Sequence, residues 1–278
     1  NLALLLDPRH AVYGLQPHAD SRHPMLHTRI NDMAAHHAAK IRSVQPHGPY
    51  LVGGMGAGGV IAFEVARQLE TAGEPVALVA LLDAAAPGAR ENPWRTTAAR
   101  FQNFSKTITA KETGRASSTA VALKAARKIR NLASYTVRNR LAGLRDRARL
   151  RLLEHHLDRG RATPGFVQDL DVRKVYLYAE SRHRLTAAVR SPLALIRATE
   201  GRDADEPYMA RYVDPLFGWG DRSLGGLETI DVPGGHSSML QTPHVETLAR
   251  LLQTRVDEAL KIYGLGDHLD DEHRSPIK

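Results

Sequence analysis

The first ninety residues alternate between helical and strand-like patterns of apolar positions. In residues 28–44 the apolar positions recur with the period of an α-helix. The runs GPYLVGG (48–54) and PVALVALLD (75–83) are instead continuously apolar, which is typical of parallel strands that are covered on both faces. Residues 60–73 between these runs predict a helix, so the order helix, strand, helix, strand predicts an α/β fold. The predicted buried face of the first helix carries Ile30, Met33, Ala34, His37, Ile41 and Val44.

The pattern changes between residues 90 and 188, where basic, alanine-rich stretches predict helices, the last of them over 173–185. Strand character returns in SPLALIRATEG (191–201) and LETIDVPGG (227–235), and residues 244–263 predict a closing amphipathic helix. A helical block that interrupts an α/β core is a common way to build a lid. The predicted division is a core of residues 1–89 and 189–265, a helical lid of residues 90–188 and a flexible tail of residues 266–278.

The composition of the 278-residue chain narrows the chemistry. With 42% hydrophobic residues, the chain can form the core of one large domain or two small ones. It contains no cysteine, which excludes disulfides, thiolate metal ligands and a cysteine nucleophile. We therefore expect a cytoplasmic protein, and we assign it no metal site. No apolar stretch has the length of a membrane span, so no membrane is expected as a partner.

Positive charge is concentrated in one part of the chain. Residues 90–161 contain 18 Lys and Arg against 5 Asp and Glu, whereas the whole chain has a net charge of only +8. Such a block can bind nucleic acid, an anionic membrane or an acidic protein, or it can be a solvated helical face. Binding of single-stranded nucleic acid also uses stacked aromatic rings. Because Tyr135 is the only aromatic residue between Phe104 and Phe166, we expect no nucleic acid partner.

A glycine cluster between the first predicted strand and the following helix permits two interpretations. Gly54, Gly56 and Gly59 match the G-x-G-x-x-G pattern of dinucleotide-binding folds. In those folds an acidic residue that binds the ribose follows about 20 residues later. Here the acidic residue at the end of the next strand is Asp83, 24 residues past Gly59. The glycines of dinucleotide-binding folds also usually follow the first strand of the domain, whereas about 50 residues precede them here. Both facts count against a dinucleotide site.

The second interpretation is a nucleophile elbow, G-x-S-x-G, in which a serine occupies a sharp turn from strand to helix. The stretch from Gly54 to Gly58 matches this motif, except that Gly56 stands where the serine belongs. Asp83 ends the next strand, and His236 lies in a loop between a strand and the last helix. The chain order of turn, acid and histidine is that of α/β-hydrolases. The carboxyl ends of parallel strands would bring these positions together.

These motifs resemble the thioesterase domains that release products from nonribosomal peptide and polyketide synthases. The segment GPYLVGGMGAGGVIAFEVARQLETAGEPVALVALLDAAAPG is similar to the family's G-P-Y-x-L-x-G-x-S-x-G-G stretch and to its L-x-D-x-x-x-P strand end. PGGHSSMLQTPHVETLARLL resembles the family's histidine loop and last helix, and VYGLQP and PLALIRATEG also fit. The resemblance implies an α/β-hydrolase fold, with a mostly parallel central sheet flanked by helices and a helical lid.

The resemblance also implies roles for four positions. Gly56 occupies the nucleophile position, Asp83 is the acid and His236 is the general base. The backbone N–H of Ala57 would be one oxyanion donor. In this family, an acyl or peptidyl carrier protein presents its chain on a phosphopantetheine arm, and the domain binds no cofactor itself. The thioester is released by hydrolysis or by macrocyclisation. Because glycine has no side chain that can attack a carbonyl, we predict that this chain is inactive or impaired.

Other possibilities stay open at this point. The chain can be a catalytically silent member that binds carrier or acyl chain, or a dinucleotide-binding oxidoreductase. Ser237 and Ser238 adjoin His236, and we expect them to make loop hydrogen bonds rather than to act as nucleophiles. The resemblance further implies that the chain starts after the family's first strand and after the loop that supplies a second oxyanion donor.

The basic lid suggests how a carrier protein would dock. Carrier proteins are typically acidic, so a cationic lid would attract one by charge complementarity. The candidate docking residues are Arg127, Lys128 and Arg130.

Overall fold

A computed structural model describes residues 1–20, 23, 25–92 and 141–265. The chain divides into two compact units. The first comprises Asn1–Asp20, Met25–Asn92 and Asp171–Lys278, and the second comprises Ser21–Pro24 and Pro93–Leu170. The candidate docking residues Arg127, Lys128 and Arg130 and the predicted tail lie outside the described residues.

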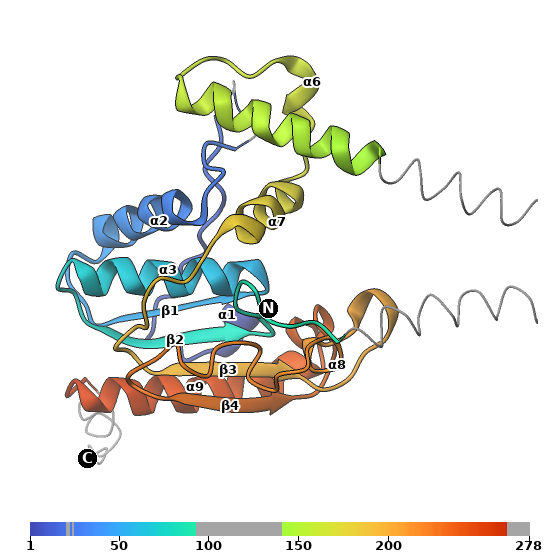
Figure 1. Cartoon of the computed structure of the whole chain (residues 1–278). Helices are drawn as coiled ribbons and strands as arrows, with labels where there is room; N and C mark the ends of the chain where they lie inside the picture. The colour runs from blue at the N-terminus through green and yellow to red at the C-terminus, as the bar shows by residue number, and fades with distance from the viewer. Residues whose placement is uncertain (21–22, 24, 93–140, 266–278) are drawn as a thin grey trace, which may run out of the picture. The chain divides into compact units, whose positions relative to one another are not determined.

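The first unit contains a four-stranded parallel sheet with strand order β1-β2-β3-β4 (Figure 1). The runs that predicted strands form these strands, which confirms the predicted α/β fold. Because all four strands are parallel, their carboxyl ends lie at the same edge of the sheet. The strands are β1 (Tyr50–Met55), β2 (Val76–Leu82), β3 (Leu193–Ala198) and β4 (Leu227–Val232).

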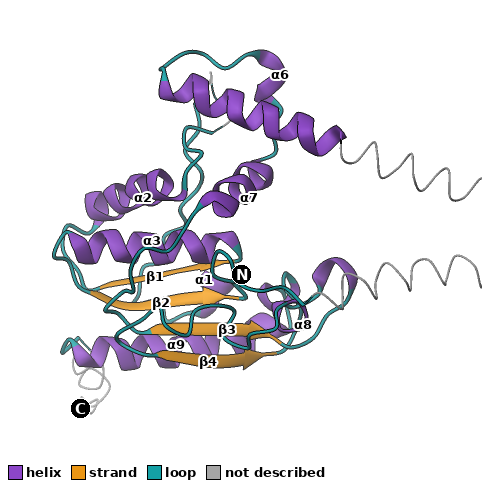
Figure 2. Ribbon diagram, viewed as in Figure 1, coloured by secondary structure: helices purple, strands orange, loops and turns teal. Residues whose placement is uncertain are grey.

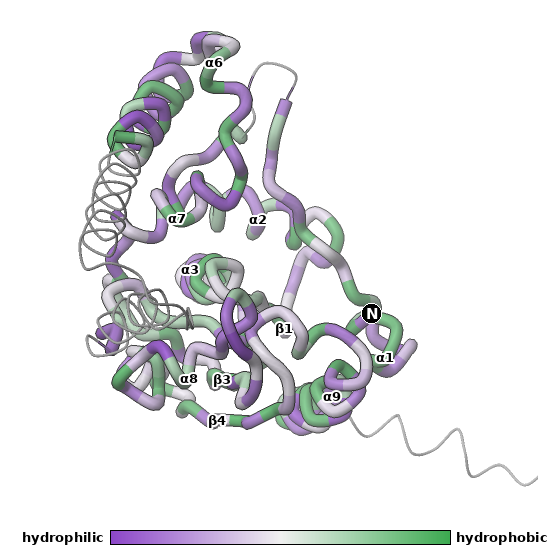
Figure 3. The backbone as a smooth tube through the Cα atoms, turned by 90° about the vertical axis from the view of Figure 1, so that its right-hand side faces the viewer, coloured by the Kyte–Doolittle hydropathy of each residue, from purple (hydrophilic) through white to green (hydrophobic). Residues whose placement is uncertain are grey.

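Helices cover both faces of this sheet. Helix α3 (Ala57–Thr71) contacts β1 and β2, whereas α9 (His244–Ile262) contacts β2 and β4. Figures 1 and 3 show α3 and α2 on one face, and α9 and α1 on the other. β2 is buried at every position because it is covered from both sides, as its unbroken apolar run predicted. The shorter helical elements of this unit are α1 (Leu2–Leu5), η1 (Asp203–Asp205), α8 (Tyr208–Arg211) and η2 (Ser238–Leu240).

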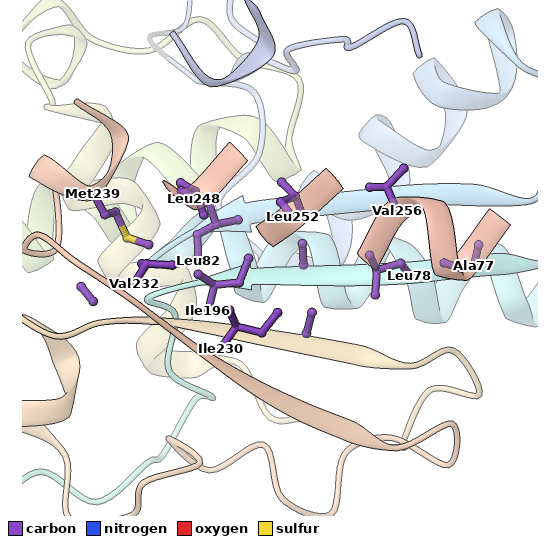
Figure 4. Close-up of a cluster of buried hydrophobic side chains, with 14 of the residues drawn as sticks. Ala77, Leu78, Leu82, Ile196, Ile230, Val232, Met239, Leu248, Leu252 and Val256 are labelled. Carbon is purple, nitrogen blue, oxygen red and sulfur yellow. The ribbon is translucent and has the colours of Figure 1, made fainter. Parts of the chain in front are cut away.

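The side of the sheet that faces α9 holds a continuous apolar core (Figure 4). Leu248, Leu252 and Val256 recur at helical spacing along α9 and pack toward the strands. They meet Leu82 of β2 and Ile196 of β3. Complete burial of one such side chain stabilises the fold by about 1.5–3 kcal/mol, so this face holds the strand ends rigidly in place.

Helix α2 (Ile30–Val44) forms where the helical spacing predicted a helix, and it packs on α3. The predicted face is buried at Ile30, Met33 and His37. Ile41 is half-buried, and Val44, the last residue of the helix, has 58% of its surface exposed.

Helix α7 (Val172–Arg182) lies within residues 90–188, the range predicted for the inserted lid, and that division stays a prediction. This segment, which was predicted as helical, packs against α3 and α2 and belongs to the first unit. The ring of His183, directly after α7, lies 3.9 Å from the Glu64 carboxylate of α3. Through these contacts α7 joins the unit that contains the sheet, whose last segment begins at Asp171.

In the second unit, the described residues 141–170 form two helices joined by a short connection. Residues 141–158 form one helix, and α6 (Gly165–Gln168) follows after a short connection (Figure 2). Leu150 and Leu153 of the longer helix are buried, as is Val167 of α6. Within the residues that the structure describes in either unit, no helix combines the length and the apolar character that crossing a bilayer requires.

Candidate functional site

The four sequence-predicted site positions lie at the carboxyl edge of the sheet. Gly56 follows β1, Ala57 begins α3, and Asp83 follows β2. His236 lies in the loop between β4 and α9. The strand register pairs Met55 with Leu82, so that the turn after β1 and the acid after β2 become neighbours. In parallel sheets this edge is where ligands bind.

Asp83 and His236 form a hydrogen-bonded pair. The Nδ1 atom of His236 lies 2.8 Å from Oδ2 of Asp83, whose side chain is fully buried. Asp83 also accepts backbone N–H hydrogen bonds from Tyr208, at 3.2 Å, and from Ala198, at 3.4 Å. A carboxylate that faces Nδ1 favours the tautomer with the proton on that nitrogen. Nε2 of His236 is then free to accept a proton, which is what a general base requires.

Gly56 has the backbone geometry of a sharp elbow. Its φ of 52° and ψ of −121° lie in a region that L residues rarely adopt. Its N–H donates to the Leu82 carbonyl at 3.1 Å, and its own carbonyl accepts from the Gly59 N–H at 3.0 Å. A Cβ atom placed on Gly56 would lie 3.5 Å from Nε2 of His236 and 3.8 Å from the Tyr208 hydroxyl. A side chain at position 56 would therefore lie against the edge of the His236 ring that carries Cε1 and Nε2.

The elbow depends on two close backbone approaches. A Cβ on Gly54 would lie 2.2 Å from the Gly58 carbonyl oxygen, and one on Gly59 would lie 2.4 Å from the Ala84 Cβ. A Cβ on Gly58 would meet nothing within 4 Å. The G-x-S-x-G motif has its two glycines at positions 54 and 58. The structure requires glycine at 54 and 59 instead, because Gly59 is the residue at which α3 crosses the end of β2.

Ala57, the predicted oxyanion donor, is the first residue of α3. The first N–H groups of a helix have no partner within the helix, and they carry the positive end of its dipole. The Ala57 N–H is therefore suited to bind a negatively charged oxygen beside position 56. This role is a prediction that the geometry permits.

Tyr208 is a site residue that the sequence analysis missed. Its ring stacks on the His236 imidazole, with centroids 4.6 Å apart and ring planes at 7°. Burial raises the pKa of its hydroxyl above the ordinary value, so the hydroxyl stays protonated at neutral pH. No motif marks Tyr208, and its place after β3 at the carboxyl edge was the only available signal.

Asp205 is a second residue that the sequence analysis missed. Its carboxylate accepts N–H hydrogen bonds from Ser237, at 2.6 Å, and from Ser238, at 3.1 Å, together with the Ser238 hydroxyl. Its carbonyl accepts from the His236 N–H at 3.1 Å. Although burial acts to raise the pKa of Asp205, these hydrogen bonds from Ser238 and Ser237 lower it. An ionised Asp205 thus holds the histidine loop.

Ser238 behaves as the sequence analysis expected. Its hydroxyl donates to Asp205 and accepts from the Gly235 N–H at 2.8 Å. The Ser237 side chain has no described contact with His236, and the residue is exposed at the surface. Ser238 is therefore committed to loop hydrogen bonds, and the elbow remains the position that faces the histidine.

Comparison with known proteins identifies one family. The model of the thioesterase domain matches residues 1–256, which include the elbow, the acid and the histidine loop. Two curated relatives match the chain over most of its length. An inactive atromentin synthetase, invA4 of Paxillus involutus, is 23% identical over 257 residues, covering 92% of this chain and 25% of the relative. A microperfuranone synthase of Emericella nidulans is 26% identical, covering 88% of this chain and 25% of the relative. The chain thus spans about a quarter of these relatives.

Among solved structures, a four-domain nonribosomal peptide synthetase bound to AMP and glycine is similar in fold. The TM-score is 0.51 at 21% identity, covering 91% of this chain and 18% of the synthetase. At this identity the similarity concerns the fold alone, and it agrees with the parallel sheet flanked by helices described above.

Proposed function

We infer the function of this chain from its family: it belongs to the thioesterase domain family, whose model matches residues 1–256. We propose that its carboxyl-edge site is a chain-release site for a thioester delivered by a carrier protein. We further propose that Gly56 occupies the nucleophile position, so that the chain as it stands cannot form the acyl-enzyme.

One observation carries this proposal. A Cβ atom on Gly56 would lie 3.5 Å from Nε2 of His236, while Nδ1 of the same ring lies 2.8 Å from Asp83. A serine hydroxyl sits about 1.4 Å beyond Cβ, and rotation about χ1 would bring it within hydrogen-bonding distance of Nε2. Nucleophile, base and orienting acid would then follow one another as in serine hydrolases. A glycine-rich turn without this function has no need of an Asp–His pair aimed at it.

The chemistry of the complete site follows from this geometry. A serine oxygen at position 56 attacks the thioester carbonyl while His236 accepts its proton, and the Ala57 N–H binds the oxyanion. His236 then returns the proton to the leaving sulfur, which departs as the thiol. Water or a nucleophile of the acyl chain, deprotonated by His236, finally breaks the ester. Hydrolysis gives a free acid, and attack from within the chain gives a ring.

With Gly56 in place, only part of this sequence of steps remains. The Asp–His pair can still deprotonate a water, and the Ala57 N–H can still bind an oxyanion. Enzymes that lose their nucleophile keep a small residual acceleration from such groups. We therefore propose that the chain holds a carrier-bound acyl chain but turns it over slowly at most.

A silent binding member is the second candidate function. It is favoured by the retention of a hydrogen-bonded Asp83 and His236 opposite a residue with no side chain. Membership of the thioesterase domain family counts against the dinucleotide-binding alternative. The chain-release proposal and the silent-binding proposal share the same partner, a carrier protein with a phosphopantetheine arm. They differ in whether a serine at position 56 would restore release of the acyl chain.

Gly56→Ser tests the proposal, with Gly56→Ala as its matched control. Both variants place a Cβ in the same strained backbone, but only serine adds a hydroxyl. We expect Gly56→Ser to acquire an acyl adduct on position 56 when it is incubated with an acyl-carrier or acyl-pantetheine thioester, as seen by mass spectrometry. Its hydrolysis rate should rise at least 100-fold above that of Gly56→Ala.

Two further variants separate the outcomes. Gly56→Ser combined with His236→Ala should lose the gained activity, because the serine then has no base. If Gly56→Ser folds and binds the carrier but gains neither adduct nor turnover, the site is a binding site only. If it folds and neither binds nor reacts, the nucleophile assignment is wrong.

A further inference from the structure

Three histidine rings meet where the segment before α2 returns to that helix. His18 lies in the stretch between α1 and α2, His27 lies just before α2, and His36 lies on α2 itself. The Leu26 N–H donates a 2.8 Å hydrogen bond to the His18 carbonyl, which fixes the two ends of this segment together. One ring nitrogen of each histidine lies within 4.8 Å of those of the other two.

The three rings pack closely together: His36 stacks nearly parallel on His18, with ring planes at 10°, and is tilted by 39° against His27. The centroid of His36 lies 4.1 Å from that of His18 and 5.3 Å from that of His27. The Nε2 atom of His27 is buried and has no hydrogen-bond partner among the described residues. A buried polar atom without a partner is costly, and in native proteins it commonly marks an absent water or ion.

The protonation state of the cluster suits a cation ligand set. Burial lowers the pKa of both His27 and His36, and the neighbouring His18 lowers both further when it carries charge. Neutral imidazoles present a lone pair, which is the form that binds a metal. Asp32 acts in the opposite direction on His27, and His37 and Lys40 add to the lowering at His36.

We propose that His18, His27 and His36 together bind one divalent transition-metal ion of the zinc class. Imidazole nitrogens are preferred ligands of such ions, and three of them form a common zinc ligand set with a fourth position left for water. Nitrogens on a tetrahedral zinc lie about 3.3 Å apart, so the rings must rotate inward from their present spacing. Because His18 is exposed, its ring is free to make this rotation. The exposed side of the cluster also allows the ion to enter from solvent.

The bound ion would tie the segment that carries His18 to helix α2. This site was not assigned from the sequence, because a spacing of nine residues between successive ligands matches none of the short metal motifs. The proposal is independent of the chemistry at Gly56, so it is tested by metal binding rather than by activity.

The experiment uses the full chain, free of any histidine tag and stripped of metal. Zinc is titrated by calorimetry, and cobalt(II) is titrated by visible absorption, which reports tetrahedral ligation. We expect one ion per chain, together with a rise in melting temperature. His18→Ala, His27→Ala and His36→Ala should each weaken binding about tenfold or more.

His47→Ala is the matched control, because the His47 side chain is 83% exposed and faces Glu74 rather than the cluster. It should bind zinc as the wild type does. His18→Ala is the most informative variant, since replacing an exposed residue leaves the core intact, and circular dichroism verifies its fold. The proposal is overturned if the wild type binds no zinc, if the triple alanine variant binds as the wild type does, or if His47→Ala loses as much affinity as His18→Ala.

Discussion

The phenol ring of Tyr208 lies parallel to the imidazole of His236, with ring centroids 4.6 Å apart. The backbone N–H of the same tyrosine donates to the Asp83 carboxylate at 3.2 Å. One residue, the first of α8, therefore contacts both members of the Asp–His pair. Its side chain restricts the orientation of the imidazole, and its main chain holds the carboxylate that orients the imidazole.

Removing the Tyr208 ring should weaken the restored enzyme, because stacked aromatic pairs contribute about 0.5–1.5 kcal/mol beyond their buried area. In the Gly56→Ser background, Tyr208→Ala should lower kcat/KM for an acyl thioester about two- to tenfold. Tyr208→Phe keeps the ring and should stay within about twofold of its parent. Equal losses in the two variants would assign the effect to the hydroxyl and not to stacking.

Asp205 should matter for the same activity although it does not touch the Asp–His pair with its side chain. In the Gly56→Ser background, Asp205→Ala leaves the N–H groups of Ser237 and Ser238 without their acceptor and frees the loop that carries His236. We expect kcat/KM to fall about tenfold or more. Asp203→Asn, an exposed neighbour in η1, is the control and should be neutral. An unaffected Asp205→Ala enzyme would show that the loop needs no such anchor.

A side chain at position 56 should lower the stability of the fold, even where it restores activity. Because Gly56 has φ of 52°, any side chain there strains the backbone by about 1–3 kcal/mol. Both Gly56→Ser and Gly56→Ala should therefore unfold at lower urea concentration than the wild type, by similar amounts. A side chain that left stability unchanged would mean that the turn relaxes to a different backbone conformation.

The glycines around the elbow should differ sharply in tolerance. Gly54→Ala places a Cβ 2.2 Å from a backbone oxygen and should destabilise the fold by about 3 kcal/mol or more, or prevent folding. Gly58→Ala lies in α3 with open space around the new Cβ, so it should stabilise by up to about 1 kcal/mol. Chemical denaturation of the pair measures both. The reverse order of stability would contradict the close approach of Gly54 in β1 to the Gly58 carbonyl in α3.

Stability should fall on mild acidification through His183. Burial lowers the pKa of His183 below 6.5, and the opposing effect of Glu64 is smaller. The folded state therefore binds its proton less readily than the unfolded state does. The stability that neutral His183 contributes to the folded state is complete above pH 6.5. It is lost as the pH falls below 6.5 toward the pKa of His183 in the folded state. His183→Gln should flatten the dependence of the melting temperature between pH 7.5 and about pH 5. An equally steep dependence in the variant would place its origin elsewhere.

The strands and most helices were predictable because their signals are local. The unbroken apolar run of β2 reports burial on both faces, and the periodicity of α2 reports one buried face. The elbow was predictable as a motif, but the need for glycine at position 59 was not, because the crowding there comes from Ala84, which follows β2. The helical pattern of α7 was also predictable, whereas its packing on α3 was not, because that contact joins residues about 110 positions apart in the chain.

By itself, the sequence determined the α/β order, the three chain-distant positions 56, 83 and 236, and the absence of a side chain at the first of them. Those features depend only on residue type and on the periodicity of apolar positions over two to four residues. Only the tertiary structure decided that Tyr208 stacks on His236, that Asp205 anchors the loop of His236, and that His18, His27 and His36 lie side by side. These relationships join residues that no local period connects, because they arise where parallel strands end at one edge and where a loop returns to a helix.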